Sequence, residues 1–289
     1  MCVAIPTFGR EEVLLSTIQA VLAQSPPADE IIVVDQTSAH SPNFEIVLEE
    51  FQRKRAIRYI RQSPPNLPAA RNRALDETEC DVVVFIDDDV ELYEGFVEAH
   101  RQNYISCPGL AAVAGRVTRK LPWQAAKSPQ QWPRAMDFRF FDFDGQERVE
   151  DIANFNGANH SVQVSTARKY GGYDVKFTGV ALREDTDLAL RLFLGGEKVV
   201  FDPSAHLYHL FAPMGGCRVE EWGDFTIAQN LIYFSRKHRQ ALAGYGTFEL
   251  WRAYRLGVLN RSNLWRPRQL FEKTLRFVIA LRNASRAAV

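Results

Sequence analysis

Short apolar runs alternate with amphipathic stretches over the first 120 residues of the chain. Residues 82–86 form an uncharged run typical of a buried strand, whereas Leu14, Ile18 and Val21 recur at the spacing of one helix face. Runs of the first kind predict strands at 3–5, 31–34, 57–61, 82–86 and 111–117, and stretches of the second kind predict helices at 14–22, 44–54, 67–78 and 93–104. This alternation predicts an α/β fold with a parallel sheet covered by helices on both faces.

The pattern changes after residue 120. Residues 121–149 are rich in Trp, Pro, Phe, Asp and Gln and predict a long irregular loop. Periodic segments then return, with strands expected at 157–164 and 198–201 and helices at 165–170 and 185–194. Each of these two helices is followed by a Gly-Gly pair, which suits a helix end.

The strongest chemical signal follows the strand at 82–86. Ligands of such sheets bind beyond the carboxyl ends of the strands, and Asp87, Asp88 and Asp89 stand at this end. In extended backbone Asp87 and Asp89 point to one face and can share one ion. Their hard oxygens suit Mg2+ or Mn2+. The alternative interpretation is an acidic surface turn.

Five further residues each admit two interpretations. Asp35 ends a strand and could accept hydrogen bonds from a nucleobase or ribose, or it could close an Asx-turn. Arg71, near a helix start, could grip a phosphate or lie solvated on the helix. Asp185 could serve as a general base or as a helix N-cap. His206 and His209 lie where the chain could return to a metal, although such histidines are more often packed core residues.

Composition narrows the class of protein. The chain has 289 residues with 35 Lys and Arg and 35 Asp and Glu, an ordinary globular composition without net charge. Its four cysteines form no CxxC pair, so neither a disulfide scaffold nor a structural zinc site is expected. The chain opens without a signal-peptide pattern, and no apolar run approaches the length of a membrane span. These features predict a soluble, cytoplasmic protein.

The zero net charge conceals two unlike segments. Residues 236–289 hold twelve basic residues against Glu249 and Glu272, a balance of +10, so residues 1–235 carry −10. Aromatic residues such as Trp251 interleave with the basic ones, which suits peripheral contact with an anionic membrane. The alternative is a helical appendage that packs on the acidic domain or on a second subunit, giving a homodimer. No recognition motif supports nucleic-acid binding.

A series of short motifs occurs along the chain in a fixed order. They are IPTFGR at 5–10, VVDQTS at 33–38, ARN at 70–72, FIDDD at 85–89, GANHS at 157–161, GGYD at 171–174, EDTDL at 184–188 and the late His209. The series resembles the glycosyltransferase family 2 enzymes of the GT-A fold, over about residues 2–240. The resemblance implies a Rossmann-like, mostly parallel central sheet flanked by helices, here with a basic helical C-terminal extension.

The resemblance also implies roles for individual residues. Asp185 matches the catalytic base, with Glu184 beside it. The positions that match the metal site are Asp87, Asp89 and His209. The positions that match nucleotide and donor binding are Pro6, Thr7, Arg10, Asp35, Arg71, Asp87, Asp88, Gly157 and Asn159. The sequence departs from the common family pattern at Gly9, Gln36 and Arg183, which leaves the donor preference open.

The expected function is the metal-dependent, inverting transfer of a sugar to an acceptor hydroxyl. The implied donor is a nucleotide-diphosphate sugar, the cofactor Mg2+ or Mn2+, and the acceptor a saccharide or lipid-linked molecule. Such a reaction belongs to cell-surface polysaccharide or glycolipid synthesis, in the cytoplasm or at the inner face of the membrane. Two alternatives stay open: a non-catalytic nucleotide-sugar binding module, and a sugar-phosphate nucleotidyltransferase, which is expected to carry a Gly-rich loop that residues 5–10 lack.

The same reasoning divides the chain into domains. Residues 1–235 are expected to form the GT-A catalytic domain, with a nucleotide-binding half at 1–120 and an acceptor half at 121–235. Residues 236–289 are expected to form the basic helical extension.

Overall fold

A computed structural model describes residues 1–119, 142–216 and 223–242, together with positions 251, 254, 274, 275 and 277–279. Most of the irregular loop expected at 121–149 lies outside these residues. The chain divides into two compact units. The first contains residues 1–65, 69–173 and 185–216; the second contains residues 66–68, 174–184 and the chain from 217 onward.

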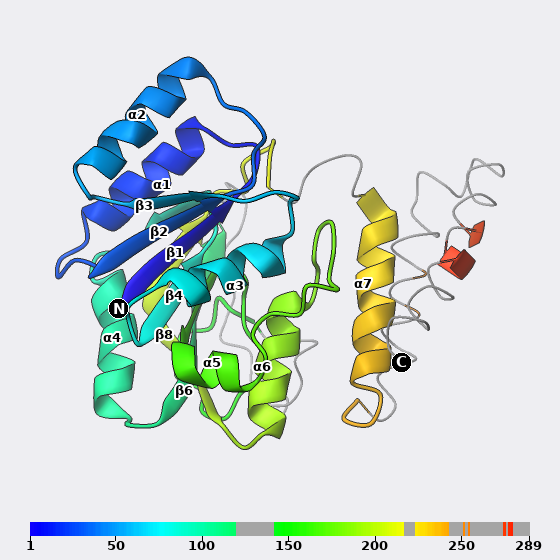
Figure 1. Cartoon of the computed structure of the whole chain (residues 1–289). Helices are drawn as coiled ribbons and strands as arrows, with labels where there is room; N and C mark the ends of the chain where they lie inside the picture. Colours follow the sequence, from blue (N-terminus) through cyan, green and yellow to red (C-terminus); the bar gives the residue numbers. More distant parts are fainter. Residues whose placement is uncertain are drawn as a thin grey trace. The chain divides into compact units, whose positions relative to one another are not determined.

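An eight-stranded sheet runs through the described part of the first unit (Figure 1). Its strands are β1 (Cys2–Thr7), β2 (Glu30–Asp35), β3 (Arg58–Arg61), β4 (Val82–Ile86), β5 (Val90–Leu92), β6 (Leu110–Arg119), β7 (Asn159–Gln163) and β8 (Lys198–His209). They lie in the order β3-β2-β1-β4-β7-β6-β8-β5. The first four are mutually parallel, as are β6 and β8, whereas β7 runs antiparallel to β4 and β6, and β5 antiparallel to β8.

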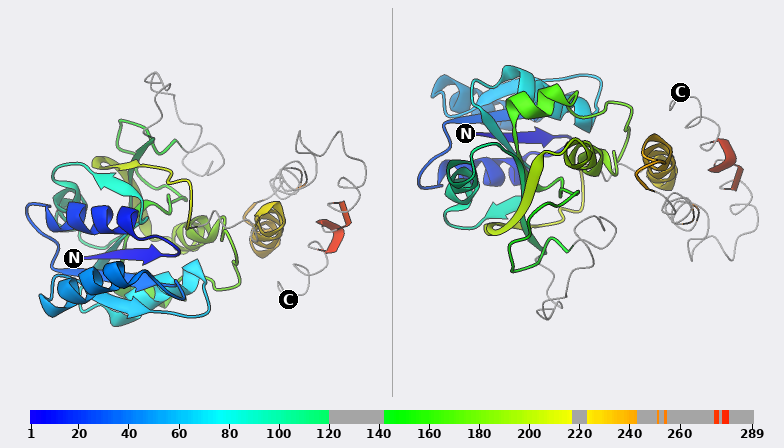
Figure 2. Two further views of the ribbon diagram at one scale, coloured as in Figure 1. Left: turned by 90° about the horizontal axis from the view of Figure 1, so that it is seen from above. Right: turned by 90° about the horizontal axis from the view of Figure 1, so that it is seen from below.

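Helices cover both faces of this sheet. They are α1 (Glu12–Leu22), α2 (Pro42–Arg53), α3 (Leu67–Glu77), α4 (Phe96–Ser106), α5 (Val164–Lys169) and α6 (Glu184–Leu194). Because side chains alternate along a strand, Phe85 of β4 faces the core built with α3, α5 and α6, whereas Ile86 faces the core built with α1, α2 and α4. Figure 2 shows α1 (dark blue) and α5 (green) on opposite sides of β1.

The strands and helices predicted for the first 120 residues are present, and the sheet is mostly parallel as expected. Strand β5 and helix α7 were not predicted, and two of the predicted strands differ from the prediction. The strand expected at 157–164 is the antiparallel β7, and the strand expected at 198–201 continues as β8 to His209. The continuation passes an irregularity, because Gly115 pairs with Asp202 whereas Arg116 already pairs with His206. Extra residues on one strand of this kind form a β-bulge.

Asn159 holds the two strands together at this bulge. Its amide nitrogen donates to the carbonyl oxygens of Arg116 (2.9 Å) and Ala205 (2.8 Å), and its oxygen lies 3.0 Å from His100 Nε2. A Cβ atom on Gly115 would lie 2.3 Å from the Asn159 amide nitrogen, so only glycine leaves room for it. The bulge thereby directs the remainder of β8 toward His209.

The described part of the second unit includes the segment 174–184 and helix α7 (Gly223–Lys237). Asn230 of α7 binds the backbone of Thr178 twice, accepting from its nitrogen (3.2 Å) and donating to its oxygen (2.8 Å). Lys237 forms a 2.6 Å ion pair with Asp174. The segment is therefore fixed to α7 by side-chain bonds.

The basic C-terminal segment is described at few positions. The domain boundary predicted after Ser235 falls inside α7, which ends at Lys237. Beyond residue 242 the structure describes only Trp251, Tyr254 and two short helical pieces within 274–279. None of the helices in the described parts is long and apolar enough to cross a membrane.

Candidate active site

The acidic triplet occupies the turn between β4 and β5. Ile86 ends β4 and Val90 begins β5, so the three aspartates are the whole connection between the two strands. Thr17 of α1 fixes this turn, because its hydroxyl donates to the carbonyl of Asp88 (2.9 Å) and accepts from the amide of Val90 (3.3 Å). The polar Thr17 on the buried face of α1 was not singled out by sequence reasoning.

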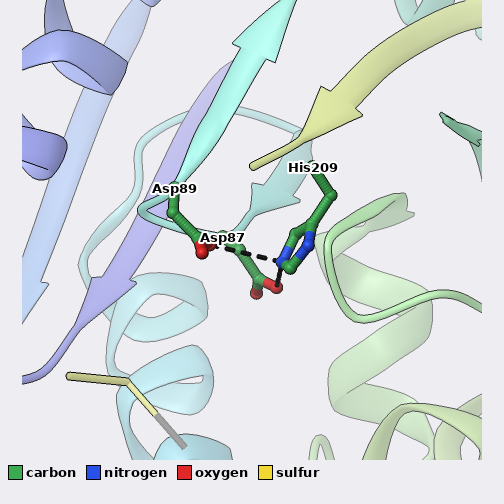
Figure 3. A group of neighbouring side chains, drawn as sticks. All are labelled: Asp87, Asp89 and His209. Atoms are coloured by element: carbon green, nitrogen blue, oxygen red, sulfur yellow. Dashed lines mark ion pairs between the residues drawn. The ribbon is translucent and has the colours of Figure 1, made fainter. Parts of the chain in front are cut away.

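Asp87, Asp89 and His209 converge as Figure 3 shows. The Nε2 atom of His209 lies 3.2 Å from Asp87 Oδ2 and 3.3 Å from Asp89 Oδ1. The three potential ligand atoms lie within 4.8 Å of one another. His209 reaches this position because it pairs with Val90 across β8 and β5, directly after the triplet. The structure thus brings together the three residues that the resemblance assigns to the metal.

The electrostatics of this group fit a divalent cation. Burial lowers the pKa of His209, but the two facing carboxylates outweigh burial and raise it to about 9. Burial disfavours the charged form of Asp89 as well and so raises its pKa, but His209 and Arg10 outweigh burial and bring the pKa of Asp89 below its ordinary value. The imidazolium therefore compensates two carboxylates where a metal ion would, and His209 Nδ1 is buried without a hydrogen-bond partner in the described structure. The two carboxylates offer the oxygen ligands that Mn2+ and Mg2+ prefer, and a neutral imidazole is a further metal ligand.

The end of β1 is joined to the triplet through Asp88. Pro6 and Thr7 are the last residues of β1. The Thr7 hydroxyl donates to Asp88 Oδ2 (2.6 Å), and Arg10 forms ion pairs with Asp88 (2.5 Å) and Asp89 (2.9 Å). Burial raises the pKa of Asp88 to about 6, against the opposing effects of Arg10 and Thr7. The side chains of Thr7 and Arg10 thus both bind Asp88.

Asp35 is fully buried at the end of β2. Its Oδ1 accepts from the amide of Thr37 (2.8 Å), and its Oδ2 accepts from the hydroxyl of Tyr59 (2.7 Å) and lies 2.5 Å from His40 Nε2. His40 continues the network to Glu11, at 3.2 Å. The Asx-turn expected as one interpretation of Asp35 is present in the bond to Thr37, and the network holds the carboxylate of Asp35 in one orientation.

Asp185 lies beside Gly157 and Arg71. The guanidinium of Arg71 is buried against the rings of Phe85 and Tyr173 and donates to the Gly157 carbonyl (2.9 Å). A Cβ atom on Gly157 would lie 3.0 Å from Arg71 NH2 and 3.2 Å from Asp185 Oδ2. Because Gly157 has no side chain, the charged groups of Arg71 and Asp185 can both lie close to its Cα atom.

The two oxygens of Asp185 have different surroundings. Oδ1 accepts from the amide (2.6 Å) and the hydroxyl (3.2 Å) of Thr186, whose hydroxyl also donates to Asn154 (2.9 Å). Oδ2 faces the space above Gly157. One oxygen thus anchors the carboxylate at the start of α6, while the other is directed toward the space where a side chain at Gly157 would lie.

The strand register places both groups at one end of the sheet. Ile86 of β4 pairs with Asn159 of β7, and the strands run in opposite directions. Asp87 therefore follows Ile86 at the same end at which Gly157 precedes Asn159. The group of Asp87, Asp89 and His209 and the group of Asp185, Gly157 and Arg71 both lie at the carboxyl end of β4, where ligands of α/β sheets bind.

The side chains of two other candidates, Asn159 and His206, bind outside these groups. The side-chain amide of Asn159 donates to the two backbone carbonyls at the bulge described above. His206 bonds to the hydroxyl of Thr118 (2.7 Å) rather than joining the metal-type group, and burial lowers its pKa to about 4. Glu184 is buried as the first residue of α6 and belongs to the second unit. Of the two late histidines, only His209 faces the carboxylates.

Comparison with known proteins defines the class. Residues 2–162, more than half of the chain, match Glycosyl transferase family 2, and the chain belongs to this family. It is 27% identical over 209 residues to the probable glycosyltransferase YdaM of Bacillus subtilis (strain 168). That match covers 70% of this chain and 49% of YdaM, so the chain spans about half the length of this relative.

Solved structures show the same fold at low identity. Mannosyltransferase PcManGT from Pyrobaculum calidifontis, in complex with GDP-Man and Mn2+, has a TM-score of 0.58 and 17% identity, covering 100% of this chain and 75% of PcManGT. A fragment of S. aureus TarS in complex with UDP-GlcNAc has a TM-score of 0.62 and 14% identity, covering 100% of this chain and 83% of the fragment. GalNAc-T7 with UDP, GalNAc and Mn2+ has a TM-score of 0.60 and 13% identity, covering 86% of this chain and 53% of GalNAc-T7. The fold is that of the GT-A glycosyltransferases.

Proposed function

We propose that the chain is a metal-dependent, inverting glycosyltransferase that moves a sugar from a nucleotide-diphosphate sugar to an acceptor hydroxyl. The observation that carries this proposal is the convergence of Asp87, Asp89 and His209 at the end of the sheet where Asp185 also stands. Membership of Glycosyl transferase family 2 supports it. The nucleotide sugars and Mn2+ in the titles of the similar structures agree with it.

The donor side of the proposal uses residues around the triplet. Asp87, Asp89 and His209 would hold Mg2+ or Mn2+, which supplies charge neutralisation for the leaving diphosphate when bound. Arg71 offers a fixed positive charge near Gly157 for the same developing charge. Asp35 is the proposed contact for the nucleobase, held in place by Tyr59.

The transfer step follows from the position of Asp185. Its Oδ2 would accept the proton of the acceptor hydroxyl while that oxygen attacks the anomeric carbon. The bond from this carbon to the diphosphate oxygen breaks as the new glycosidic bond forms on the opposite face, so the carbon is inverted. No enzyme nucleophile takes part in a single displacement.

The acceptor side rests on the C-terminal segment. We propose a saccharide or lipid-linked acceptor, used in cell-surface polysaccharide or glycolipid synthesis at the cytoplasmic face of a membrane. Leu275, Val278 and Ile279 are exposed, and their i, i+3 and i+4 spacing would place them on one face of a continuous helix within a segment of charge +10. Such a face suits peripheral contact with an anionic membrane, and a second subunit is the alternative partner.

A thermal-shift screen tests donor binding. Full-length protein is heated with UDP-, GDP- and dTDP-sugars, each with and without Mn2+. A correct donor raises the midpoint by mass action, and the rise is larger with Mn2+. Asp89→Asn is expected to lose the Mn2+ dependence, whereas the exposed control Glu50→Gln retains it. No shift with any donor would contradict the proposed function.

Transfer by Asp185→Asn tests catalysis. We expect the variant to keep the donor-induced shift and to lose about 10^2- to 10^4-fold in transfer rate, the range typical of a lost general base. Undiminished transfer would overturn the role of Asp185. A donor shift without any transfer or donor hydrolysis by the wild type would instead indicate a binding module. Release of pyrophosphate from a nucleoside triphosphate and a sugar phosphate would indicate a nucleotidyltransferase.

A further inference from the structure

The segment after β8, residues 210–216, folds back over the triplet and the end of β1. Its amides at Leu210 and Ala212 donate to the carbonyl (2.9 Å) and to Oδ2 (2.8 Å) of Asp89. The amide of Gly216 donates to the carbonyl of Phe8 (2.7 Å). The segment thus connects, in a few residues, the acidic turn with the loop that follows β1.

Arg10 lies between this segment and the triplet. On one side its NH1 contacts Asp88 (2.5 Å) and Asp89 (2.9 Å). On the other side its Nε donates to the carbonyl of Met214 (3.1 Å) and its NH2 to that of Gly215 (3.5 Å). The residue is only 7% exposed. A planar guanidinium spreads its donors over three nitrogen atoms and can serve acceptors on two sides at once, whereas a Lys ammonium presents its three donors at a single atom.

The segment carries two glycines where it meets Arg10. Gly215 has φ +76°, and a Cβ atom there would lie 2.5 Å from Arg10 Cγ and 2.6 Å from the carbonyl oxygen of Gly9. Gly216 has φ +58°, and its Cβ atom would lie 3.0 Å from Arg10 NH2. Both the left-handed backbone and the close approach require glycine. The backbone that contacts Arg10 at residues 215 and 216 therefore leaves no room for a side chain.

We propose that Arg10 is a positioning residue that couples the segment 210–216 to the acidic triplet, instead of contacting the nucleotide itself. Its charge allows Asp88 and Asp89 to be buried side by side, since unpaired buried carboxylates are costly. Its other edge holds the segment in the closed arrangement that directs Ala212 to Asp89. Loss of Arg10 therefore frees the segment and releases the orientation of Asp89 together. This inference concerns the donor site of the proposed function and rests on it for its effect on turnover.

Hydrogen–deuterium exchange on the full chain, without metal or donor, tests the coupling independently of activity. In Arg10→Met we expect the amides of Ala212 and Gly216 to exchange at least about tenfold faster, because their acceptors lose a fixed position. Arg10→Lys is expected to behave like Arg10→Met, since one ammonium cannot reach both sides. If the amides of Ala212 and Gly216 exchange as slowly in Arg10→Lys as in the wild type, a positive charge at position 10 is sufficient, and the proposed coupling is overturned.

A glycine substitution approaches the same contact from the other side. Gly215→Ala leaves Arg10 and the triplet chemically intact but displaces the segment, so we expect the same faster exchange at Ala212 and Gly216. Gly95→Ala is the matched control, because Gly95 has φ +74° and nothing within 4 Å of the added Cβ atom. The double variant Arg10→Met with Gly215→Ala is expected to exchange no faster than either single variant, as coupled sites do. Additive effects would contradict the coupling.

Kinetics connect the coupling to the proposed function. With the donor found in the thermal-shift screen, Arg10→Lys and Gly215→Ala are expected to raise the donor KM about tenfold with a smaller change in kcat, as expected when donor binding rather than the chemical step is impaired. If the wild type transfers no sugar, the proposed function fails while the exchange data still decide the coupling. If the wild type is active and both variants keep its KM, the segment has no part in donor binding.

Discussion

Asn159 and Arg10 both belong to motifs that the resemblance assigns to donor binding, and both side chains bind within the protein. The Asn159 amide is divided between β6, β8 and His100, and the Arg10 guanidinium between the triplet and the segment 210–216. A polar residue with all its bonds buried stabilises one arrangement of the backbone around it. At these two positions the motif residues orient their neighbours.

Asn159→Ala is expected to destabilise the first unit by about 2–4 kcal/mol, because it leaves the buried carbonyls of Arg116 and Ala205 without donors. Urea unfolding of the full chain measures the change. Asn43→Ala, on the exposed face of α2, serves as the control and is expected to change stability by less than about 0.5 kcal/mol. Equal stability of Asn159→Ala and the wild type would show that the bulge persists without its amide.

His100 makes stability depend on pH in the acid range. Its imidazole is buried between Ser161 (2.9 Å) and Asn159 (3.0 Å), and burial lowers its pKa from 6.5 to about 4. Above pH 6.5 neither the folded nor the unfolded state binds the proton. Between pH 6.5 and 4 only the unfolded state binds it, so stability falls as pH falls, and the loss levels off below pH 4.

The size of this effect is up to about 3 kcal/mol, since each unit of pKa shift corresponds to about 1.4 kcal/mol. Thermal unfolding between pH 8 and pH 4 measures it. His100→Gln cannot titrate, so its melting temperature is expected to fall less steeply with acid than that of the wild type, whatever its value at pH 8. Parallel curves for the two proteins would exclude His100 as a source of the acid sensitivity.

At the scale of elements, α7 and the segment 174–184 form one bonded piece of the second unit. Asn230→Ala removes both bonds to the backbone of Thr178, and we expect faster exchange of the Thr178 amide and a loss of about 1–3 kcal/mol in local stability. Gln229→Ala, one position away on α7 and half-buried, is the control. Unchanged protection of Thr178 in Asn230→Ala would show that the other contacts with α7 suffice.

Elements set by local pattern were predictable, and elements set by distant pairing were not. The apolar runs that form β1, β2 and β4 indicate buried strands without reference to their neighbours, and all three are buried in the structure. The strand β5 has three residues, too few for a periodic signal, and exists because Val90 pairs with His209 more than a hundred positions away. The direction of β7 and the bulge at Gly115 likewise depend on pairing with distant strands.

The same distinction holds in the site. Residue types and spacing were enough to single out Asp87, Asp89, His209 and Asp185 as candidates. What positions them was not visible, because Thr17 reaches the triplet from α1 by a single buried hydroxyl. A threonine among apolar helix positions has no signal that separates it from an ordinary core residue.

At the scale of the whole molecule, the neutral chain combines a segment of charge −10 with one of +10. We expect full-length protein to sediment with vesicles that contain anionic lipid, and less so with zwitterionic vesicles or at high salt. Replacement of Leu275, Val278 and Ile279 by Glu is expected to reduce binding at least about tenfold, because it removes the exposed apolar face.

Ile105→Glu, at a more exposed apolar residue on α4, is the control for this experiment and is expected to bind as the wild type does. Equal sedimentation of the triple variant and the wild type would exclude the apolar face. In that case the concentration dependence of the molecular mass in solution tests the alternative partner, a second copy of the chain.

The second unit is assembled from three separate stretches of sequence, 66–68, 174–184 and the chain from 217 onward. A chimeric protein that takes its second unit from a relative therefore cannot be made by joining the two sequences at one position. A chimera needs five junctions. One lies between Glu184 and Asp185, inside the first turn of α6 and directly beside the proposed base, and another lies between Pro68 and Ala69, inside the first turn of α3. An exchange of the whole second unit therefore interrupts the Glu184–Asp185 peptide, whereas single substitutions within the unit leave that peptide in place.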